Sequence, residues 1–438
     1  MAYVIGVLVA LVVLLASIAL HEVGHMVPAK RFGVRVSQYM VGFGPTLWSR
    51  TRGETEYGVK AIPLGGYVRL IGMYPPATAV DAPAGTSWWR RLAADARAAS
   101  AEEIHPGEDH RAFYRLSTPK KLVVMLGGPV MNLLIAVVLM AIVLVGIGLP
   151  TATTTLGSVS ECVLPADAPV SRTCEDGDQA APGAAAGLRP GDTVVTYDGT
   201  AVTSWDQLSR LIRATGDDTV PMVVERDGRQ VELSVTPVVA PRPVLADDGS
   251  VVTRDDGTVV TTPVGFLGVG PTEEVRRQPL ADVPASVGTM TWQTLSVVAA
   301  LPARVVDLAQ VTFGSGERGT DSIVGVVGIG RFAGEIASVQ GEGVDWGMRA
   351  AALLQMLAAL NIALFVFNLI PLPPLDGGHV AAALWEGGRR QVARLRGLPR
   401  PGPFDTARLV PVAYAVFVLL GAVGVLLVYA DIVKPVAV

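Results

Sequence analysis

The chain has 438 residues, of which 50% are hydrophobic and 17% are charged, and its formal net charge is −4. This composition excludes an ordinary soluble domain and predicts several membrane spans together with a sizeable polar part. No stretch of the sequence combines basic and aromatic residues as a nucleic-acid-binding surface does, so nucleic acid is not an expected partner.

Four stretches of the chain are long and apolar enough to cross a lipid bilayer as helices. They are Tyr3–Val27, Leu122–Leu149, Met348–Leu369 and Leu409–Ala430. The first has no basic residues before it and no small-residue cleavage site after it, so we expect it to stay as an anchor. The predicted fold class is a polytopic α-helical membrane protein with about four spans.

Basic residues mark three of the segments beside these spans. They follow span one, precede span two and follow span three: Lys30, Arg31, Arg35, Arg50, Arg52, Lys120, Lys121, Arg389, Arg390, Arg394, Arg396 and Arg400. Loops with an excess of Lys and Arg stay in the cytoplasm. We therefore expect both termini, and the long segment between spans two and three, to be extracytoplasmic.

The first span ends in His21-Glu22-Val23-Gly24-His25, which is the H-E-x-x-H pattern of zinc hydrolases. On a helix the two histidines stand one turn apart on one face and can share a metal ion, while Glu22 can act on water beside it. The alternative is a lipid-facing helix end with incidental polar residues. That alternative is unfavourable, because an unpaired charge at membrane depth costs about 2.5–3.5 kcal/mol. The pattern predicts one Zn²⁺ per chain.

A zinc ion held by two histidines needs a third protein ligand, and the end of span three offers one. The sequence from Asn368 to His379 reads NLIPLPPLDGGH. Its prolines are expected to end or unwind the helix, and the two glycines after Asp376 allow a tight turn. Spans one and three both reach the cytoplasmic side at their C-terminal ends, so Asp376 is expected to meet His21 and His25 at similar depth. His379 is the competing candidate ligand.

Residues 42–72 are predicted to form a β-hairpin directly after the first span. Strand-forming residues lie on both sides of a turn at Arg52-Gly53-Glu54. Such a hairpin can dip toward the membrane only where protein or a water-filled cavity shelters its backbone. Its edge, which includes Gly65 and Gly66, is expected to hold an extended substrate by strand addition. A purely structural role is the alternative.

The segment that starts near Pro150 has the pattern of a small α+β domain. Its predicted elements are strands at 153–160, 193–197, 221–225 and 230–236, a helix at 204–214, and turns at Asp198-Gly199 and Asp227-Gly228. The sequence from Ala184 to Asp192, AAAGLRPGD, resembles bacterial PDZ domains, in which a peptide adds as a strand beside the helix. A small β-rich domain without peptide binding is the alternative.

The chain has two cysteines, Cys162 and Cys174, and both lie in this predicted exported segment. Disulfides persist outside the cytoplasm, so we expect the two residues to be bridged. The bridge would close a short loop and contribute roughly 3 kcal/mol to stability. Two free thiols are the alternative.

Five features together resemble the site-2 protease family of intramembrane zinc metalloproteases. They are HEVGH on the first span, the hairpin with GFGPTLW and GETEYGVKAIPLGGY, GGPVMN at 127–132, the PDZ-like segment and NLIPLPPLDGGH. The resemblance covers nearly the whole chain and is closest to the actinobacterial proteases that cut anti-sigma factors. It implies that a site-1-type protease first trims a single-span substrate outside the bacterial inner membrane, and that this enzyme then cuts within the membrane.

The resemblance also implies roles for individual residues. The family's zinc ligands and its catalytic base correspond to His21, His25, Asp376 and Glu22. Its substrate-handling segment corresponds to Asn368, Pro371 and Pro373. One departure is that some relatives carry two tandem PDZ domains, whereas this sequence shows one.

We expect four successive regions. They are the first half of the membrane core at 1–149, the PDZ-like domain with a following β and loop segment at 150–283, an amphipathic juxtamembrane segment at 284–346, and the second half of the membrane core at 347–438.

Two functions from other classes are the alternatives to a protease: a non-catalytic scaffold that binds peptides, and a metal transporter. The complete H-E-x-x-H pattern argues against the scaffold. A transporter needs a polar path, and spans two and four offer little beyond Asn132.

Overall fold

The computed structural model describes residues 1–80, 87–165, 172–244, 251–252, 258–314, 316, 318–319, 322–340 and 345–436. These residues form two compact units. The first unit joins Met1–Ile147 with Gln278–Val438, and the second is Gly148–Arg277. The second unit is therefore an insertion into the chain of the first.

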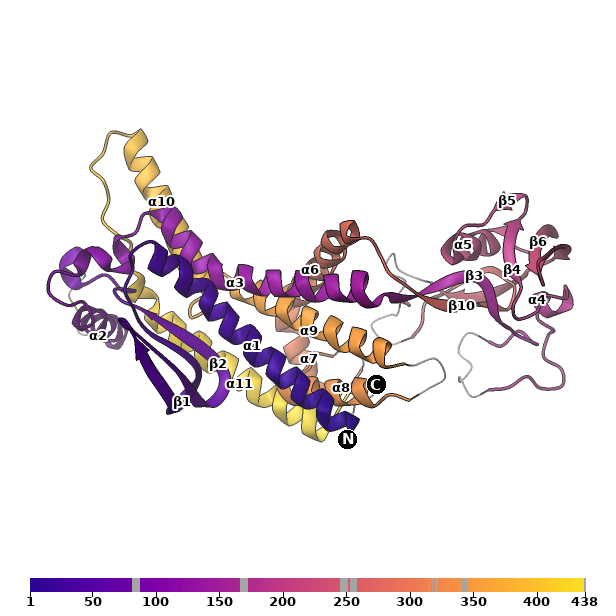
Figure 1. The fold of residues 1–438 in the computed structure, drawn as a ribbon, viewed down its shortest axis with the longest axis horizontal. Coiled ribbons are helices and arrows are strands. Elements are labelled where there is room, and N and C mark those ends of the chain that lie inside the picture. The colour runs from indigo at the N-terminus through magenta and orange to yellow at the C-terminus, as the bar shows by residue number, and fades with distance from the viewer. Residues whose placement is uncertain are drawn as a thin grey trace. The chain divides into compact units, whose positions relative to one another are not determined.

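Within the described ranges, four helices of the first unit are long and apolar enough to cross a membrane, as predicted. They are α1 (Ala2–Arg31), α3 (Thr118–Ala141, continued as a π-helix over Ile142–Ile147), α9 (Trp346–Asn368) and α11 (Val410–Val433). At 1.5 Å per residue, each of them is long enough for the roughly 30 Å apolar core of a bilayer. α3 packs against both α1 and α9, and Figure 1 shows the three helices running alongside one another. The chain is a multi-pass membrane protein.

Small residues let α1 approach a neighbouring helix closely, as is common between membrane helices. That neighbour is α8 (Val326–Ser338). A Cβ atom on Gly6 of α1 would lie only 2.3 Å from the carbonyl oxygen of Ala333. A Cβ atom on Gly334 of α8 would lie 2.5 Å from the Tyr3 ring. The N-terminal end of α1 therefore rests directly on the α8 backbone.

A bent pair of helices precedes α8 in the chain: α6 (Val283–Ala299) and α7 (Leu301–Phe313). Together they are long and apolar enough for a fifth span, but they are bent by 64° at their junction. Pro302, in the first turn of α7, explains the break, because proline has no backbone N–H and its ring clashes with the carbonyl four residues earlier, so α6 cannot continue through it as a regular helix. The single amphipathic segment predicted over 284–346 is thus, in its described part, three helices that include this bend.

The predicted hairpin is present and is longer than expected. Its strands are β1 (Val36–Arg52) and β2 (Thr55–Leu70). Residues 38–41 of β1 pair on one side with 56–59 and on the other side with 66–69. The two long strands therefore form a small folded sheet, and 66–69 is an edge of it that has one strand partner among the described residues.

Buried ion pairs, among them those of Arg97 and Lys121, join segments of the first unit that are far apart in the sequence. Arg97, in α2 (Trp88–Glu102), donates two hydrogen bonds to the Asp405 carboxylate, at 3.1 and 2.7 Å. Lys121, at the start of α3, donates to both carboxylate oxygens of Glu386 at 2.9 Å, and Glu386 belongs to α10 (Asp376–Leu395). Removing one partner of such a pair leaves a buried charge and costs about 3–5 kcal/mol.

The first unit also contains short 3₁₀ helices. They lie at Ala77–Ala79, Asp109–Arg111, Phe113–Arg115, Leu280–Asp282 and Thr406–Leu409.

The second unit is a small α+β domain. Its larger sheet has the strand order β10-β3-β4-β6-β7 with β5 beside β4, and a separate sheet pairs β8 with β9. The strands are β3 (Leu149–Val159), β4 (Thr193–Tyr197), β5 (Thr200–Ala201), β6 (Val220–Arg226), β7 (Arg229–Val235), β8 (Val238–Pro243), β9 (Thr261–Phe266) and β10 (Val269–Arg276). The helices are α4 (Pro182–Ala185) and α5 (Trp205–Thr215). The sequence predicted β3, β4, β6, β7 and α5, but not α4, β5, β8, β9 and β10.

Local sequence explains the turns and the core of this unit. At Asp198-Gly199 and Asp227-Gly228 both residues of each pair have positive φ, as a type I′ hairpin turn requires. The Ser204 hydroxyl accepts a hydrogen bond from the Gln207 backbone N–H and so caps the start of α5. The largest core side chains come from α5, the sheet and the segment between β9 and β10: Leu156, Tyr197, Leu208, Met222 and Leu267.

Cys162 and Cys174 of the second unit are joined by a disulfide in the structure, with their Cα atoms 5.9 Å apart. Cys162 also forms an isolated β-bridge with Ala180, so the bridged loop begins beside ordered backbone. Closing a loop of this length restricts the unfolded chain and stabilises the folded unit by about 3 kcal/mol.

Candidate active site

Three side chains from distant parts of the first unit converge on one point. They are His21 and His25 on α1 and Asp376 at the start of α10. The Nε2 atoms of the two histidines lie 3.2 Å apart, and each lies 3.3 Å from Oδ2 of Asp376. The histidines are neighbours because residues four apart share one face of a helix. In the part of the chain that the structure describes, they form the one cluster of three metal-ligating side chains.

The three ligand atoms fit a zinc ion. Zinc binds histidine nitrogen and carboxylate oxygen at about 2.0–2.2 Å in a tetrahedron, which separates the ligand atoms by about 3.3–3.6 Å. The observed separations of 3.2, 3.3 and 3.3 Å are close to the edges of such a tetrahedron. Oδ2 of Asp376 is buried and accepts no hydrogen bond from the described residues, as a ligand atom facing a metal would. Three protein ligands leave the fourth position for water.

A backbone carbonyl of α3 orients His25. Nδ1 of this buried histidine donates a hydrogen bond to the Val124 carbonyl oxygen at 2.8 Å. The bond keeps the proton on Nδ1, so the lone pair of Nε2 points toward Asp376. Such a partner fixes both the tautomer and the ring orientation of a metal-binding histidine.

Asn132 of α3 holds the other histidine. Its side chain is fully buried, and its amide nitrogen lies 3.1 Å from Nδ1 of His21, while its amide oxygen has no hydrogen-bond partner among the described residues. Rotating the amide by 180° brings Oδ1 to Nδ1, where it accepts the Nδ1–H bond and leaves Nε2 free for a metal. A zinc ion bound at Nε2 of His21 would select this orientation of the amide.

Glycines make the contact between α1 and α3 close enough for these bonds. A Cβ atom on Gly127 would lie 2.0 Å from the carbonyl oxygen of Gly24. A Cβ atom on Gly128 would lie 2.2 Å from Nε2 of His25 and 2.7 Å from Nε2 of His21. No side chain fits at these positions. Sequence reasoning noted the glycine pair without assigning it this role, although adjacent glycines in an apolar span are typical of close helix packing.

The connection between α9 and α10 delivers Asp376. α9 ends at Asn368 and α10 begins at Asp376, so the proline-containing segment between them is not α-helical, as predicted. A Cβ atom on Gly377 would lie 2.2 Å from the Ile370 carbonyl oxygen, and one on Gly378 would lie 2.5 Å from the Pro373 nitrogen. The two glycines therefore let the connection fold back on the start of α10. Asp376 lies in the first turn of this helix, where the helix dipole favours a carboxylate.

Glu22 lies next to the ligand cluster in sequence, but it is not one of its three members. Its Cγ atom would lie 3.0 Å from a Cβ atom on Gly66, so the edge segment of the β1–β2 sheet packs directly on this carboxylate's side chain. Gly65 has a φ of +120° and faces the Phe43 ring. His379 is outside the cluster, and it lines a small cavity together with Lys121 and Glu386.

The remaining residues expected to handle substrate lie at the end of α9 and just after it. Asn368 is the last residue of α9, and its amide donates a hydrogen bond to the Leu364 carbonyl oxygen at 3.0 Å. Pro371 is exposed, whereas Pro373 is buried. The structure thus places the three residues in one connection but brings none of them into the His21–His25–Asp376 cluster.

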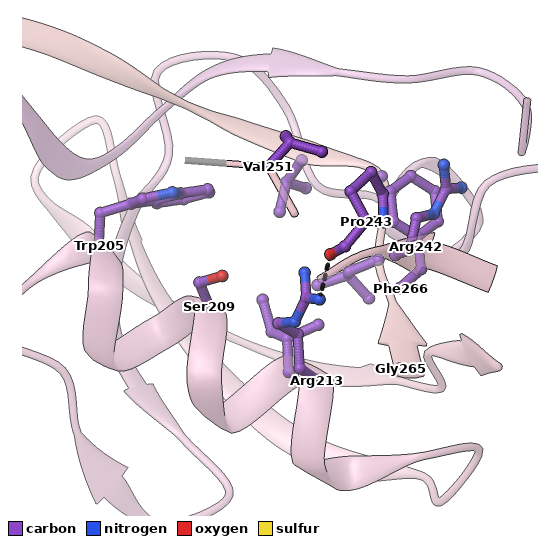
Figure 2. A pocket seen from close by; sticks show the side chains of 12 residues that line it. Trp205, Ser209, Arg213, Arg242, Pro243, Val251, Gly265 and Phe266 are labelled. Atoms are coloured by element: carbon purple, nitrogen blue, oxygen red, sulfur yellow. Dashed lines mark hydrogen bonds between the residues drawn. The ribbon is translucent and has the colours of Figure 1, made fainter. Parts of the chain in front are cut away.

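The second unit has a separate cavity of about 250 Å³ between α5 and the segment from Gly265 to Val269. Figure 2 shows Trp205, Ser209 and Arg213 lining one side of it from α5. On the other side Arg242 stacks its guanidinium 3.5 Å above the centre of the Phe266 ring. Burial, and then the charge of Arg213, lowers the pKa of Arg242. The cavity is therefore apolar with two cationic groups beside it.

Two histidines and a carboxylate held among membrane-spanning helices define a membrane-embedded zinc hydrolase. The chain matches peptidase family M50 over residues 9–397. It is 35% identical to zinc metalloprotease Rip1 of Mycobacterium tuberculosis over the whole of this chain and 99% of the relative. It is 32% identical to zinc metalloprotease Rip1 of Mycolicibacterium smegmatis over 99% of this chain and 98% of the relative.

A more distant relative is metalloprotease MmpA of Caulobacter vibrioides, which is 28% identical over 89% of each chain. The chain belongs to peptidase family M50, the site-2 protease family of intramembrane zinc metalloproteases. The membership in the site-2 protease family that its motifs led us to expect is confirmed. Zinc is its cofactor, and neither a non-catalytic scaffold nor a transporter is supported.

The contact between Asn132 and His21 predicts a zinc-affinity defect. In Asn132→Leu the Nδ1–H of His21 loses its acceptor, so the tautomer that binds metal is less favoured. We expect zinc affinity to fall about 10- to 100-fold, the usual effect of removing such a partner. Competition with a chromogenic chelator on the purified protein measures it.

Asn361→Leu is the matched control. Asn361 is also a buried asparagine of a spanning helix, but its amide donates to the Leu357 carbonyl of its own helix. This variant should keep the parent zinc affinity. Equal affinity in the two variants would show that Asn132 does not orient the ligand.

Proposed function

We propose that this protease cuts single-span membrane proteins, such as anti-sigma factors, within their transmembrane segment after a site-1-type protease has trimmed them outside. The observation that carries the proposal is the ligand triangle of His21, His25 and Asp376, in which both histidines and the neighbouring Glu22 lie on the membrane-spanning helix α1. The basic segments near the start of α3 and the end of α1 support an active site on the cytoplasmic side of the bacterial inner membrane. The same rule leaves both termini and the second unit extracytoplasmic, where the Cys162–Cys174 disulfide is stable.

We assign the chemistry to residues of the first unit. His21, His25 and Asp376 would hold the zinc ion, and a bound zinc ion would supply a Lewis acid for activating water and polarising the scissile carbonyl. The Glu22 carboxylate accepts a proton from the attacking water and then donates it to the nitrogen of the leaving amine. Asn132 and the Val124 carbonyl keep the histidine Nε2 lone pairs directed at the metal.

The substrate must unwind before it can react, because a helix hides its amides. The edge segment 66–69 has a strand partner on one side and packs at Gly66 against Glu22. We infer that an extended substrate pairs with this edge, which would place its backbone beside the catalytic carboxylate. Asn368, Pro371 and Pro373 are assigned to substrate handling on the basis of the family resemblance.

We assign peptide binding to the second unit. β10 is an edge strand of its sheet, and the cavity beside α5 lies where β10 begins, at Gly268 and Val269. An edge strand beside a helix is the arrangement by which PDZ domains add a peptide strand. Arg213 and Arg242 favour a peptide with a negative charge, such as a freed C-terminal carboxylate. The unit would thereby select trimmed substrates without taking part in the chemistry.

Replacing Glu22 by Gln tests the catalytic assignment. The amide keeps the size of the side chain but cannot take a proton, so cleavage of a single-span substrate should stop while zinc stays bound. Metal analysis and reconstituted cleavage assays measure the two effects separately.

His21→Ala provides the contrasting variant, because it removes a ligand and should lose both zinc and activity. Turnover near the parent rate in Glu22→Gln enzyme would exclude Glu22 as the base. Loss of zinc in Glu22→Gln would instead make Glu22 part of the metal site.

The contact between Gly66 and Glu22 predicts a second defect. A valine at position 66 would push its Cβ atom against Glu22 Cγ and shift the sheet edge, so turnover should fall about 100-fold with zinc content unchanged. Gly53→Asn is the control, since Gly53 is in the hairpin turn with no atom near its Cβ position and Asn tolerates its positive φ. If both variants retain the parent turnover, the edge does not position substrate or base.

The cavity beside α5 gives a test of the second unit. Ser209→Trp should fill the cavity and weaken binding of a synthetic peptide with a free C-terminal carboxylate about tenfold or more, while cleavage of a short, already trimmed substrate continues. Arg210→Trp adds the same side chain at the next, exposed position of α5 and should leave peptide binding unchanged. Equal peptide binding in parent and Ser209→Trp protein, measured by fluorescence anisotropy, would remove the peptide-binding role.

A further inference from the structure

A basic groove outside the active site lies between the start of α3 and the second half of α10. Its volume is about 640 Å³, and α3 contributes Thr118 and Pro119 to its wall. The other wall carries three arginines, Arg390 and Arg394 from α10 and Arg400 from the segment after it. The proposed catalysis uses none of these residues.

The groove has more positive charge than its own carboxylate can balance. Arg390 pairs through Nη1 with Glu386 at 2.7 Å, but Glu386 also accepts two hydrogen bonds from Lys121. Nε of Arg390 is buried and has no hydrogen-bond partner among the described residues. Arg394 and Arg400 are exposed, and no ion pair joins either of them to a described carboxylate. An anion is the ligand chemistry that satisfies these groups.

The groove lies at the depth where the chain changes from polar to apolar. α3 begins at Thr118, its two lysines follow at Lys120 and Lys121, and its apolar run starts at Leu122. Charged groups immediately beside the start of a spanning helix lie at the level of the lipid headgroups. A phosphate bound between the three arginines would therefore be at headgroup level.

An exposed apolar strip runs along α10 beside the groove. Trp385 and Leu395 are 62% and 76% exposed, and Leu384 and Val392 are exposed with them. Residues seven and eleven apart return to the same face of a helix, so these four side chains form one strip. Exposed apolar residues next to arginines are the pattern of a helix that lies in the membrane surface. The strip distinguishes a lipid from a free anion, because a free anion has no acyl chain for it to contact.

We propose that this groove binds the phosphate of an anionic phospholipid, with the headgroup between Arg390, Arg394 and Arg400 and the acyl chains along the α10 strip. The lipid would join α3 to α10, and α10 carries Asp376 in its first turn. The site is distinct from the metal cluster, and the proposal stands whether or not the substrate assignment above is correct.

Lipid counting on the full-length enzyme tests the proposal. The protein is delipidated in a neutral detergent and titrated with phosphatidylglycerol or phosphatidylcholine in mixed micelles, and bound lipid is measured by native mass spectrometry. We expect one phosphatidylglycerol per chain under conditions that leave phosphatidylcholine unbound. Arg394→Gln with Arg400→Gln should weaken phosphatidylglycerol binding about 25-fold, about fivefold for each arginine.

Arg389→Gln with Arg396→Gln is the matched control, with the same charge change on exposed residues of the same region that do not line the groove. It should keep the parent affinity, and zinc content checks the folding of both variants. Equal weakening in the two double variants would overturn the proposal in favour of diffuse attraction. Equal binding of both lipids would show that lipid adsorbs only through its acyl chains, and would overturn the proposed headgroup site. Binding of inorganic phosphate as tight as that of phosphatidylglycerol would reassign the groove to free phosphate.

Discussion

The active site depends on one close contact between two helices. Where α1 crosses α3, the carbonyl oxygen of Gly24 occupies space that a Cβ atom on Gly127 would need, and the histidine rings lie against Gly128. Only at this separation can the Val124 carbonyl reach His25. A single added methyl group at Gly127 or Gly128 would force the helices apart. The displacement would occur at the histidines, whereas a lipid-facing surface could accommodate an added methyl group. The strictest sequence requirement of the site therefore lies on a helix that supplies no ligand.

Buried polar contacts also join two further helices of the first unit, α8 and α11. Asp431, near the end of α11, accepts a hydrogen bond from Arg318 at 2.9 Å and others from the backbone N–H groups of Gly325 and Gly328 at the start of α8. α8 in turn carries the N-terminal end of α1 at Gly6. In an apolar surrounding such groups have no water to replace a lost partner, so they hold a defined geometry. α1 is thus positioned by α8 at one end and by α3 at the other.

The sequence predicted the motifs that lie on a few consecutive residues. It did not predict the contacts made by backbone atoms, which depend on how the helices pack. The HEVGH pattern and the DGGH pattern each lie on a few consecutive residues, and their meeting follows from the shared depth of two spans. The Val124 carbonyl has no signature, since every residue has a carbonyl and only the packing selects this one. The bend before α7 was foreseeable from Pro302, but the apolar pattern continues across it and favoured one segment. β8, β9 and β10 were missed because Pro and Gly interrupt their alternation.

The inserted second unit separates the candidate metal ligands in the sequence, and therefore also in the order in which they are synthesised. His21 and His25 are made with the first helix, whereas Asp376 is made only after the whole of Gly148–Arg277 and α9. A nascent or truncated chain that lacks α10 contains the complete HEVGH pattern but only two of the three ligands. With the proposed ligand set of His21, His25 and Asp376, the metal site is complete only when both halves of the membrane core have met. With these three ligands, metal occupancy would report complete assembly of the core.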